Sequence, residues 1–191
     1  MQKTIKSMIK ESVDVKMLVS KNLASKIEDS IKLIVEVIKS KKKVLIAGNG
    51  GSASQASHIA GEFVGRYKME RRGLPCIALT ADTTVLTAWS NDYNYETVFS
   101  RELEALGSEG DVFIALSTSG NSKNLVKALE AAKRMNLKTI SLLGKGGGKM
   151  KSMSDIEMIV PSSNTPRVQE AHLMVLHIMC ELIDEELFGK S

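Results

Sequence analysis

Five short, predominantly apolar segments recur along the chain, and each is followed by turn-forming residues. The first of them, Val44 to Ala47, is an unbroken apolar run, which is typical of a strand buried on both faces of a parallel sheet. We therefore predict five strands, at residues 44–47, 75–80, 111–116, 139–143 and 156–160. In the intervals between them, apolar residues such as Ile59 and Phe63 recur every fourth position, which indicates helices.

The first 40 residues contain no glycine or proline and carry two apolar stripes at helical spacing, over residues 5–17 and 23–38. Ser20 or Asn22 can cap a restart between the stripes. We therefore predict a helical hairpin over residues 1–40. Its apolar face must pack either on the sheet or on an equivalent hairpin of a second subunit, and we favour the second arrangement.

Strands that alternate with helices predict an α/β fold with a mostly parallel sheet, right-handed crossovers and helices on both faces. We interpret residues 1–191 as a single domain whose α/β core spans residues 41–191. Residues 82–107 should form two helical pieces separated by the turn-forming cluster at residues 90–92. A closing helix is predicted over residues 166–187, because proline suits a first helical turn.

The predicted loops after the strands define where a ligand should bind. Ligands of parallel sheets bind at the carboxyl ends of the strands. The sequence places four loops at that edge, at residues 48–52, 80–84, 117–122 and 144–149.

The amino-acid composition agrees with this prediction of a single α/β domain. A chain of 191 residues with 43% hydrophobic and 25% charged residues is usual for one soluble domain. The net charge of +4 comes without the aromatic or arginine-rich stripes of a nucleic-acid binder, so we predict no nucleic-acid partner. No apolar run approaches the ~18 residues that span a bilayer, and the polar start lacks a signal-peptide core. We therefore predict a cytoplasmic protein without a membrane partner. Cys76 and Cys180 lie in apolar patterns and are predicted to be core residues.

The first predicted strand runs directly into a glycine-rich loop at residues 48–52, in which Ser52 is a candidate N-cap of the next helix. This layout exposes N–H groups that can receive an anion. On the helix, His58 and Glu62 are four residues apart and project from one face. The pair can share a metal ion, form a hydrogen-bonded acid–base pair, or make an ordinary surface contact.

A second polar loop follows the third predicted strand and places four hydroxyl groups at the start of a helix. Hydroxyls, free N–H groups and the helix dipole together suit a phosphate monoester. An ordinary serine- and threonine-rich helix cap is the alternative. The loop reads Ser117-Thr118-Ser119-Gly120-Asn121-Ser122.

The closing helix carries four polar residues among apolar ones. Around the helix axis, Glu170 and His177 fall about 20° apart, whereas Gln169 and His177 fall about 80° apart. This spacing favours Glu170 as the partner of His177, while His172 points well away. A polar patch on so apolar a helix either has hydrogen-bond partners in the core or forms a functional site.

Taken together, these motifs resemble the sugar isomerase (SIS) domain and, more narrowly, the phosphoheptose isomerases. The resemblance covers nearly the whole chain. It rests on the glycine loop, the His58/Glu62 pair, the serine loop and the segment from Arg167 to His177, together with Gly65-Arg66-Tyr67, Asn91-Asp92-Tyr93 and Phe99-Ser100-Arg101.

The resemblance implies a flavodoxin-like three-layer fold with an N-terminal helical extension, and a homotetramer with sites at subunit boundaries. It also implies one zinc ion per subunit, so that Gln169 replaces Glu170 as the expected metal partner. The implied ligands are His58, Glu62, Gln169 and His177. The residues implied to hold the phosphate are Ser117, Thr118, Ser119 and Ser122, and those implied to line the sugar are Asn49, Gly50, Gly51, Ser52, Glu62, Asn91, Asp92 and Gln169.

The family's members are intramolecular oxidoreductases that convert sedoheptulose 7-phosphate to D-glycero-D-manno-heptose 7-phosphate, the first step of ADP- and GDP-heptose biosynthesis, which supplies lipopolysaccharide. Exchange between an aldose and a ketose through an enediol needs a base and an acid. Glu62 is the candidate base and His177 the candidate acid. Gln55 stands where many relatives carry an aspartate. The alternatives are a non-catalytic SIS protein that binds the bacterial replication initiator, and an isomerase or sensor of another sugar phosphate.

Overall fold

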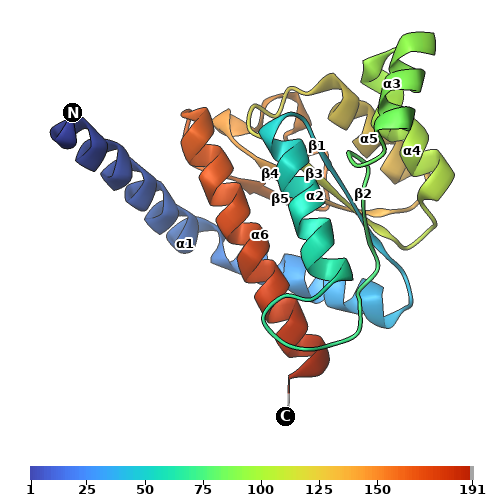
Figure 1. Cartoon of the computed structure of the whole chain (residues 1–191), viewed down its shortest axis with the longest axis horizontal. Helices are drawn as coiled ribbons and strands as arrows, with labels where there is room; N and C mark the ends of the chain where they lie inside the picture. Colours follow the sequence, from blue (N-terminus) through green and yellow to red (C-terminus); the bar gives the residue numbers. More distant parts are fainter. Residues whose placement is uncertain (190–191) are drawn as a thin grey trace.

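Five parallel strands form the centre of the molecule, in the order β2-β1-β3-β4-β5 (Figure 1). The computed structural model describes residues 1–189. The strands are β1 (Val44–Gly48), β2 (Cys76–Ala78), β3 (Val112–Ser117), β4 (Lys138–Leu143) and β5 (Ile156–Ile159). All five lie where the apolar runs predict them, so the α/β fold with a five-stranded parallel sheet is confirmed.

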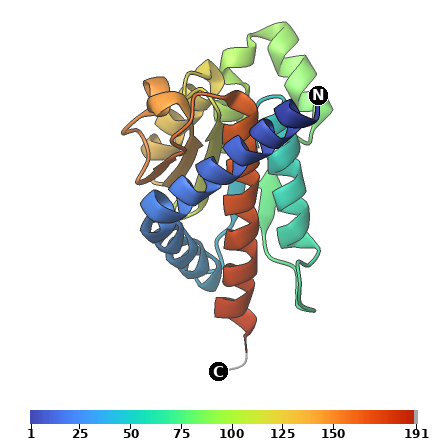
Figure 2. The same cartoon turned by 90° about the vertical axis from the view of Figure 1, so that its left-hand side faces the viewer.

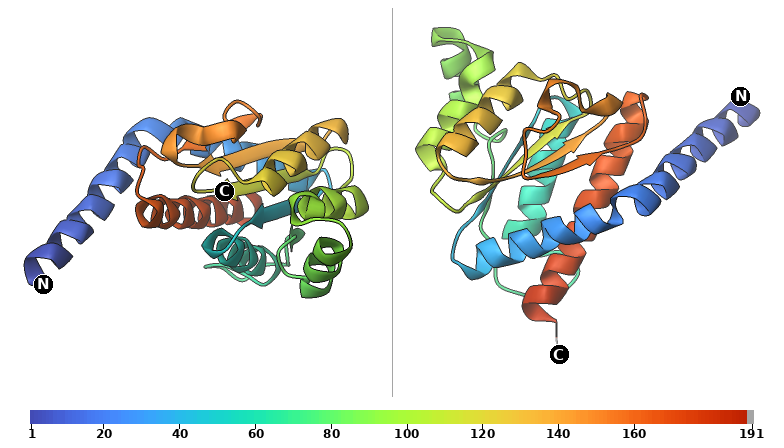
Figure 3. Two further views of the ribbon diagram at one scale, coloured as in Figure 1. Left: turned by 90° about the horizontal axis from the view of Figure 1, so that it is seen from above. Right: turned by 180° about the vertical axis from the view of Figure 1, so that it is seen from behind.

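Helices cover both faces of this sheet. They are α1 (Gln2–Lys39), α2 (Gly51–Val64), α3 (Thr83–Asp92), α4 (Val98–Leu106), α5 (Lys123–Arg134) and α6 (Thr165–Phe188), with the short 3-10 helices η1 (Tyr95–Thr97) and η2 (Lys145–Met150). Figure 3 shows the resulting layers from above.

Alternate residues of the strands pack into two separate hydrophobic cores, one on each face of the sheet. On one face, Val44 and Ile46 of β1 pack with α1, α2 and α6. On the other face, Leu45 and Ala47 pack with α4 and α5. Because every residue of β1 and β3 is buried, the strands consist of uninterrupted apolar runs rather than alternating ones.

The strand order creates a switch point between β1 and β3. The chain moves from β1 outward to β2, and then returns to place β3 on the other side of β1. Gly48 at the end of β1 lies opposite Leu116 near the end of β3. The loops that follow these two strands therefore leave in opposite directions from adjacent positions, which is where ligands of such sheets bind.

The predicted helical hairpin over residues 1–40 is wrong, because α1 is one continuous helix of 38 residues. Its buried positions begin at Val15 and continue through Val19 and Leu23 at intervals of four, so the stripe does not restart at Ser20 or Asn22. Without glycine or proline nothing interrupts the backbone hydrogen bonds. Figure 1 shows the first half of α1 extending away from the rest of the molecule, and Figure 2 shows α1 crossing α6.

Two local predictions also need correction. Ser52 does not cap α2; the N-cap is Gly50, whose positive φ of 56° suits glycine, and Ser52 lies inside the first turn. The cluster at residues 90–92 forms the last turn of α3, and the break falls just after it, at Tyr93 and Asn94.

Other predictions hold. The closing helix α6 carries Pro166 in its first turn. Cys76 and Cys180 are buried free thiols, as expected of core residues. Among the described residues, none of the helices combines the length and apolar character needed to cross a bilayer.

Candidate active site

The glycine loop after β1 is built so that the chain can turn directly into α2. A Cβ atom on Gly48 would lie 2.7 Å from the backbone of Ser52, so a larger residue would force the turn open. The Asn49 side chain is fixed next to it: its Oδ1 accepts hydrogen bonds from Asn124 Nδ2 (2.9 Å) and the Tyr95 hydroxyl (2.8 Å). The loop therefore presents an ordered amide at the switch point.

The serine loop after β3 is held in a compact turn by its own hydroxyl groups. Ser117 Oγ lies 3.0 Å from Ser122 Oγ and accepts a hydrogen bond from the Gly120 amide (3.0 Å). Ser122 is the N-cap of α5, but its side chain makes no capping hydrogen bond. The first N–H groups of α5 therefore point to a position where a bound anion can take the place of the cap.

The third loop at this edge braces the serine loop. Gly120 has a positive φ of 65°, and a Cβ on it would collide with the Gly147 carbonyl. The Met150 amide donates to Gly120 O (2.9 Å), and the Lys149 amide donates to Asn121 Oδ1 (3.1 Å). The glycines of η2 thus allow its backbone to approach the serine loop closely.

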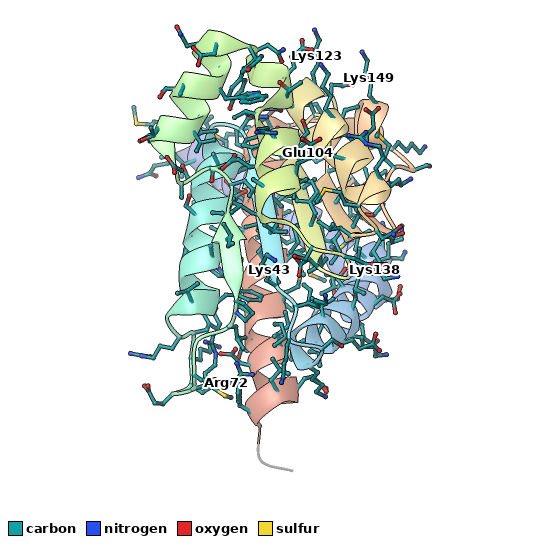
Figure 4. All side chains as sticks on the ribbon, turned by 90° about the vertical axis from the view of Figure 1, so that its right-hand side faces the viewer. Lys43, Arg72, Glu104, Lys123, Lys138 and Lys149 are labelled. Atoms are coloured by element: carbon teal, nitrogen blue, oxygen red, sulfur yellow. The ribbon has the colours of Figure 1, made fainter. Side chains whose placement is uncertain are left out.

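Two lysines lie at the same edge of the sheet. In Figure 4, Lys123 and Lys149 lie together at one end of the molecule, whereas Lys43 and Lys138, at the starts of β1 and β4, lie farther down. Lys123 directly follows the serine loop and pairs with Glu96 (2.7 Å). This placement makes the carboxyl edge of the sheet favourable for a negatively charged group.

Two imidazoles and one carboxylate converge where α2 packs against α6. The ligand atoms of His58, Glu62 and His177 all lie within 4.8 Å of one another. His58 Nε2 lies 2.9 Å from Glu62 Oε1, and the His58 and His177 rings meet edge to face at 5.1 Å between centroids. The side chains of His58 and Glu62 are 46% and 25% exposed, so a ligand can reach them. We refer to these three residues as the triad.

The triad fits a divalent metal ion by its donors. Two nitrogen ligands and one carboxylate, with no thiol among them, form the set that catalytic zinc sites use when they keep a position open for water or substrate. His177 is only partly buried and makes no hydrogen bond within residues 1–189, so it is not a core histidine satisfied by buried partners. Its ring stacks on Tyr67 at 5.7 Å, and burial raises the pKa of the Tyr67 hydroxyl.

The remaining polar residues of α6 face other neighbours. Glu170 accepts hydrogen bonds from Ser12 of α1 and from Arg167, both at 2.6 Å, so the preference for Glu170 drawn from angular spacing is wrong. Seven residues of helix move a side chain about 10 Å along the axis, where a different helix packs. His172 is fully buried against Leu143 O (3.1 Å), and burial lowers its pKa to about 4, which agrees with its predicted place away from His177.

Gln169 lies nearer to the glycine loop than to the triad. A Cβ on Gly51 would collide with the Gln169 amide, which shows that this amide rests on the start of α2. The buried Gln55 side chain donates to the Gln169 carbonyl (2.7 Å). Eight residues of helix separate Gln169 from His177, about 12 Å along the axis. The role of Gln169 as a metal ligand remains a prediction.

Asn91 and Asp92 lie at the exposed end of α3. Asn91 Nδ2 donates to Asp92 Oδ1 (3.0 Å), and within residues 1–189 no hydrogen bond joins this pair to the glycine loop or the serine loop.

Three residues near the site were given no role from the sequence: Tyr67, Tyr95 and Asn124. Tyr95 and Asn124 are revealed only by their hydrogen bonds to Asn49, because neither of these two residues belongs to a periodic pattern.

The fold and the site agree with the relatives of this chain. A family model described as "SIS domain" matches residues 9–144, and the chain belongs to the SIS domain family. Within that family, the chain is similar to curated phosphoheptose isomerases from several bacteria. The one from Sulfurimonas denitrificans is 49% identical over 191 residues, covering 99% of this chain and 98% of the relative. The one from Clostridium acetobutylicum is 46% identical over 193 residues, covering 100% and 98%.

Solved structures agree as well. The phosphoheptose isomerase from Neisseria gonorrhoeae superposes with a TM-score of 0.90 at 37% identity, and the one from Francisella tularensis with a TM-score of 0.93 at 35% identity. Each comparison covers 96% of this chain and 98% of the other. The predicted resemblance is thereby confirmed, and with it the assignment of this chain as an isomerase.

Proposed function

We propose that this chain interconverts sedoheptulose 7-phosphate and D-glycero-D-manno-heptose 7-phosphate. The observation that carries the proposal is the triad, whose three ligand atoms lie within 4.8 Å of one another. Its relatives carry the name phosphoheptose isomerase over almost their full length. A protein that only bound a partner would have no need for a carboxylate and two imidazoles gathered at one accessible position.

Glu62 acts as the base that moves the proton between the two carbons of the enediol, and His177 serves the oxygens as the acid. Glu62 Oε1 faces His58, and Oε2 has no hydrogen-bond partner in the part of the chain that the structure describes. One oxygen is therefore available for proton transfer while the other is oriented by the histidine. In the reverse direction the two residues exchange roles.

We propose that the triad holds one zinc ion per subunit. Held by these residues, a zinc ion would supply Lewis-acid chemistry, polarising a carbonyl and dispersing negative charge. His58, Glu62 and His177 supply three ligands at suitable spacing. Gln169 is the fourth ligand that the family resemblance implies.

The phosphate group binds at the serine loop, where the uncapped start of α5 and the nearby lysines favour an anion. Hydroxyls of Ser117, Thr118, Ser119 and Ser122 supply further donors. The sugar lies along the glycine loop, with Asn49, Gly50, Gly51 and Ser52, and is contacted by Asn91, Asp92 and Gln169 from the surrounding elements.

The chain assembles as a homotetramer with its sites at subunit boundaries. Six large apolar side chains in the first half of α1 are 42–65% exposed, which is unfavourable unless another subunit covers them. A groove of about 850 Å³ between α1 and α6 continues this apolar surface. The exposed residues are Ile5, Met8, Ile9, Val13, Met17 and Leu18.

We place the enzyme in the cytoplasm, at the first step of ADP- or GDP-heptose synthesis for lipopolysaccharide. The test is direct: purified protein is incubated with sedoheptulose 7-phosphate and the aldose is followed by NMR. Appearance of the aldose, and its dependence on Glu62, is expected. Absence of conversion with zinc-loaded protein would refute the proposal.

A further inference from the structure

The end of α2 depends on a side chain from outside the helix. The last carbonyl groups of a helix have no partner within it. Arg71 supplies one, because its Nη2 donates to the Glu62 carbonyl (2.8 Å) and its Nη1 to the Phe63 carbonyl (2.9 Å). The positive guanidinium is also favoured by the dipole at this end of the helix. Arg71 therefore holds the backbone of Glu62 itself.

The same guanidinium is joined to α6. Arg71 Nε donates to Asp184 Oδ1 at 2.7 Å, and the two side chains are only 2% and 4% exposed. Asp184 follows His177 by seven residues, which places both on nearly the same side of α6. One buried ion pair thus connects the helix that carries Glu62 to the helix that carries His177.

We infer that Arg71 is a positioning residue, which fixes the separation between the Glu62 carboxylate and the His177 imidazole through its buried bond to Asp184. The inference rests on the proposed function, since it assigns Arg71 to the metal site. Metal ligands must be placed to within about 0.2 Å. Glu62 and His177 belong to different helices, so a small slide of α2 along α6 changes their separation, and the Arg71–Asp184 pair opposes that slide.

A second ion pair joins the same two segments and provides a matched control. Lys68 Nζ lies 2.6 Å from Glu181, but these side chains are 63% and 37% exposed. Exposed pairs are flexible and screened by salt, so they fix position poorly. Removal of Lys68 should therefore leave the triad unchanged.

The test measures metal binding rather than turnover. Co²⁺ alone is titrated into metal-free wild-type protein and into Arg71→Lys, Asp184→Asn and Lys68→Met, with its visible absorption as the signal. Lysine keeps the charge but lacks the fork that bonds three groups at once. Variants that fold, judged by circular dichroism, should bind Co²⁺ about 10- to 100-fold more weakly for Arg71→Lys and at least about 10-fold more weakly for Asp184→Asn. Lys68→Met should match the wild type in affinity and spectrum.

Several outcomes would overturn the inference. Wild-type Co²⁺ affinity and spectrum in a folded Arg71→Lys or Asp184→Asn would show that the ion pair serves stability only. If Arg71→Lys does not fold, Asp184→Asn decides alone. Failure of the wild type to bind Co²⁺ would instead remove the proposed metal site, and the role of Arg71 with it, while turnover of sedoheptulose 7-phosphate would be tested separately.

Discussion

Replacement of Glu62 by glutamine separates the chemistry of the site from its folding. Glutamine has nearly the same shape and can still hydrogen bond to His58, so the contact at 2.9 Å need not be lost. What disappears is the negative charge, and with it the base and one metal ligand. Glu62→Gln should therefore fold normally and turn over sedoheptulose 7-phosphate at a greatly reduced rate.

The expected effects of Glu62→Gln on stability and on the catalytic rate differ enough to be told apart. The His58 and Glu62 side chains are 46% and 25% exposed, and a side-chain contact of this exposure contributes about 0–1 kcal/mol to the free energy of unfolding. A positioned general base contributes about 10²- to 10⁴-fold to the rate. This corresponds to roughly 3–5 kcal/mol in the activation free energy.

The assay follows aldose formation by NMR in zinc-loaded protein, next to urea unfolding of the same preparations. Glu181→Gln is the control, because it removes a carboxylate one turn beyond His177 that belongs to an exposed pair with Lys68. The control should keep wild-type turnover. A Glu62→Gln variant with kcat within about 10-fold of the wild type would eliminate Glu62 as the base.

Three further outcomes are expected. Removal of metal with a chelator should lower turnover, and added zinc should restore it; undiminished rates in metal-free protein would contradict the metal site. Light scattering should give the mass of four 20.8 kDa chains, and a monodisperse monomer would contradict the assembly proposed from α1. Glu102→Gln should stabilise the protein increasingly as pH rises. Burial, then the nearby Asp82, raises the pKa of Glu102 from 4.5 to about 7, so the contribution of Glu102 to wild-type stability is fully present below pH 4.5 and is lost as the pH rises to about 7. The gain should approach about 3 kcal/mol at pH 8 in urea unfolding, with exposed Glu104→Gln as a control that shows no such trend.

The sequence predicts most of the fold because its central strands, β1 and β3, are buried on both faces. Such strands need uninterrupted apolar runs, and these runs mark both strands in the sequence. The error at α1 has a physical reason: two apolar stripes separated by a few residues fit either two helices or one long helix whose buried face begins late. Only packing shows that Val15 and Val19 are buried while Val13 and Met17 are exposed.

The candidate site is predictable only in part. His58 and Glu62 are neighbours by helical spacing alone, whereas His177 joins them through the packing of α6 on α2. Angular spacing around α6 favoured Glu170 as the partner of His177. It was misleading because it does not show which helix packs against α6 at each position along the axis. Arg71 lies in a segment without periodicity, between other arginines, and nothing local marks it as the buried one.

The unequal halves of α1 make folding and association separable. All its buried side chains lie at or after Val15, so the core of a single subunit uses nothing earlier in the helix. A chain shortened to begin near that residue would lose the peripheral hydrogen bonds that join this half of α1 to α6 and to the loop before it, which are Ser12 to Glu170, Asn164 to Glu11 and Arg167 to the Met8 carbonyl. The second half of α1 thus serves the folding of the subunit and the first half serves its association. A deletion of the first half should therefore abolish association while the subunit still folds.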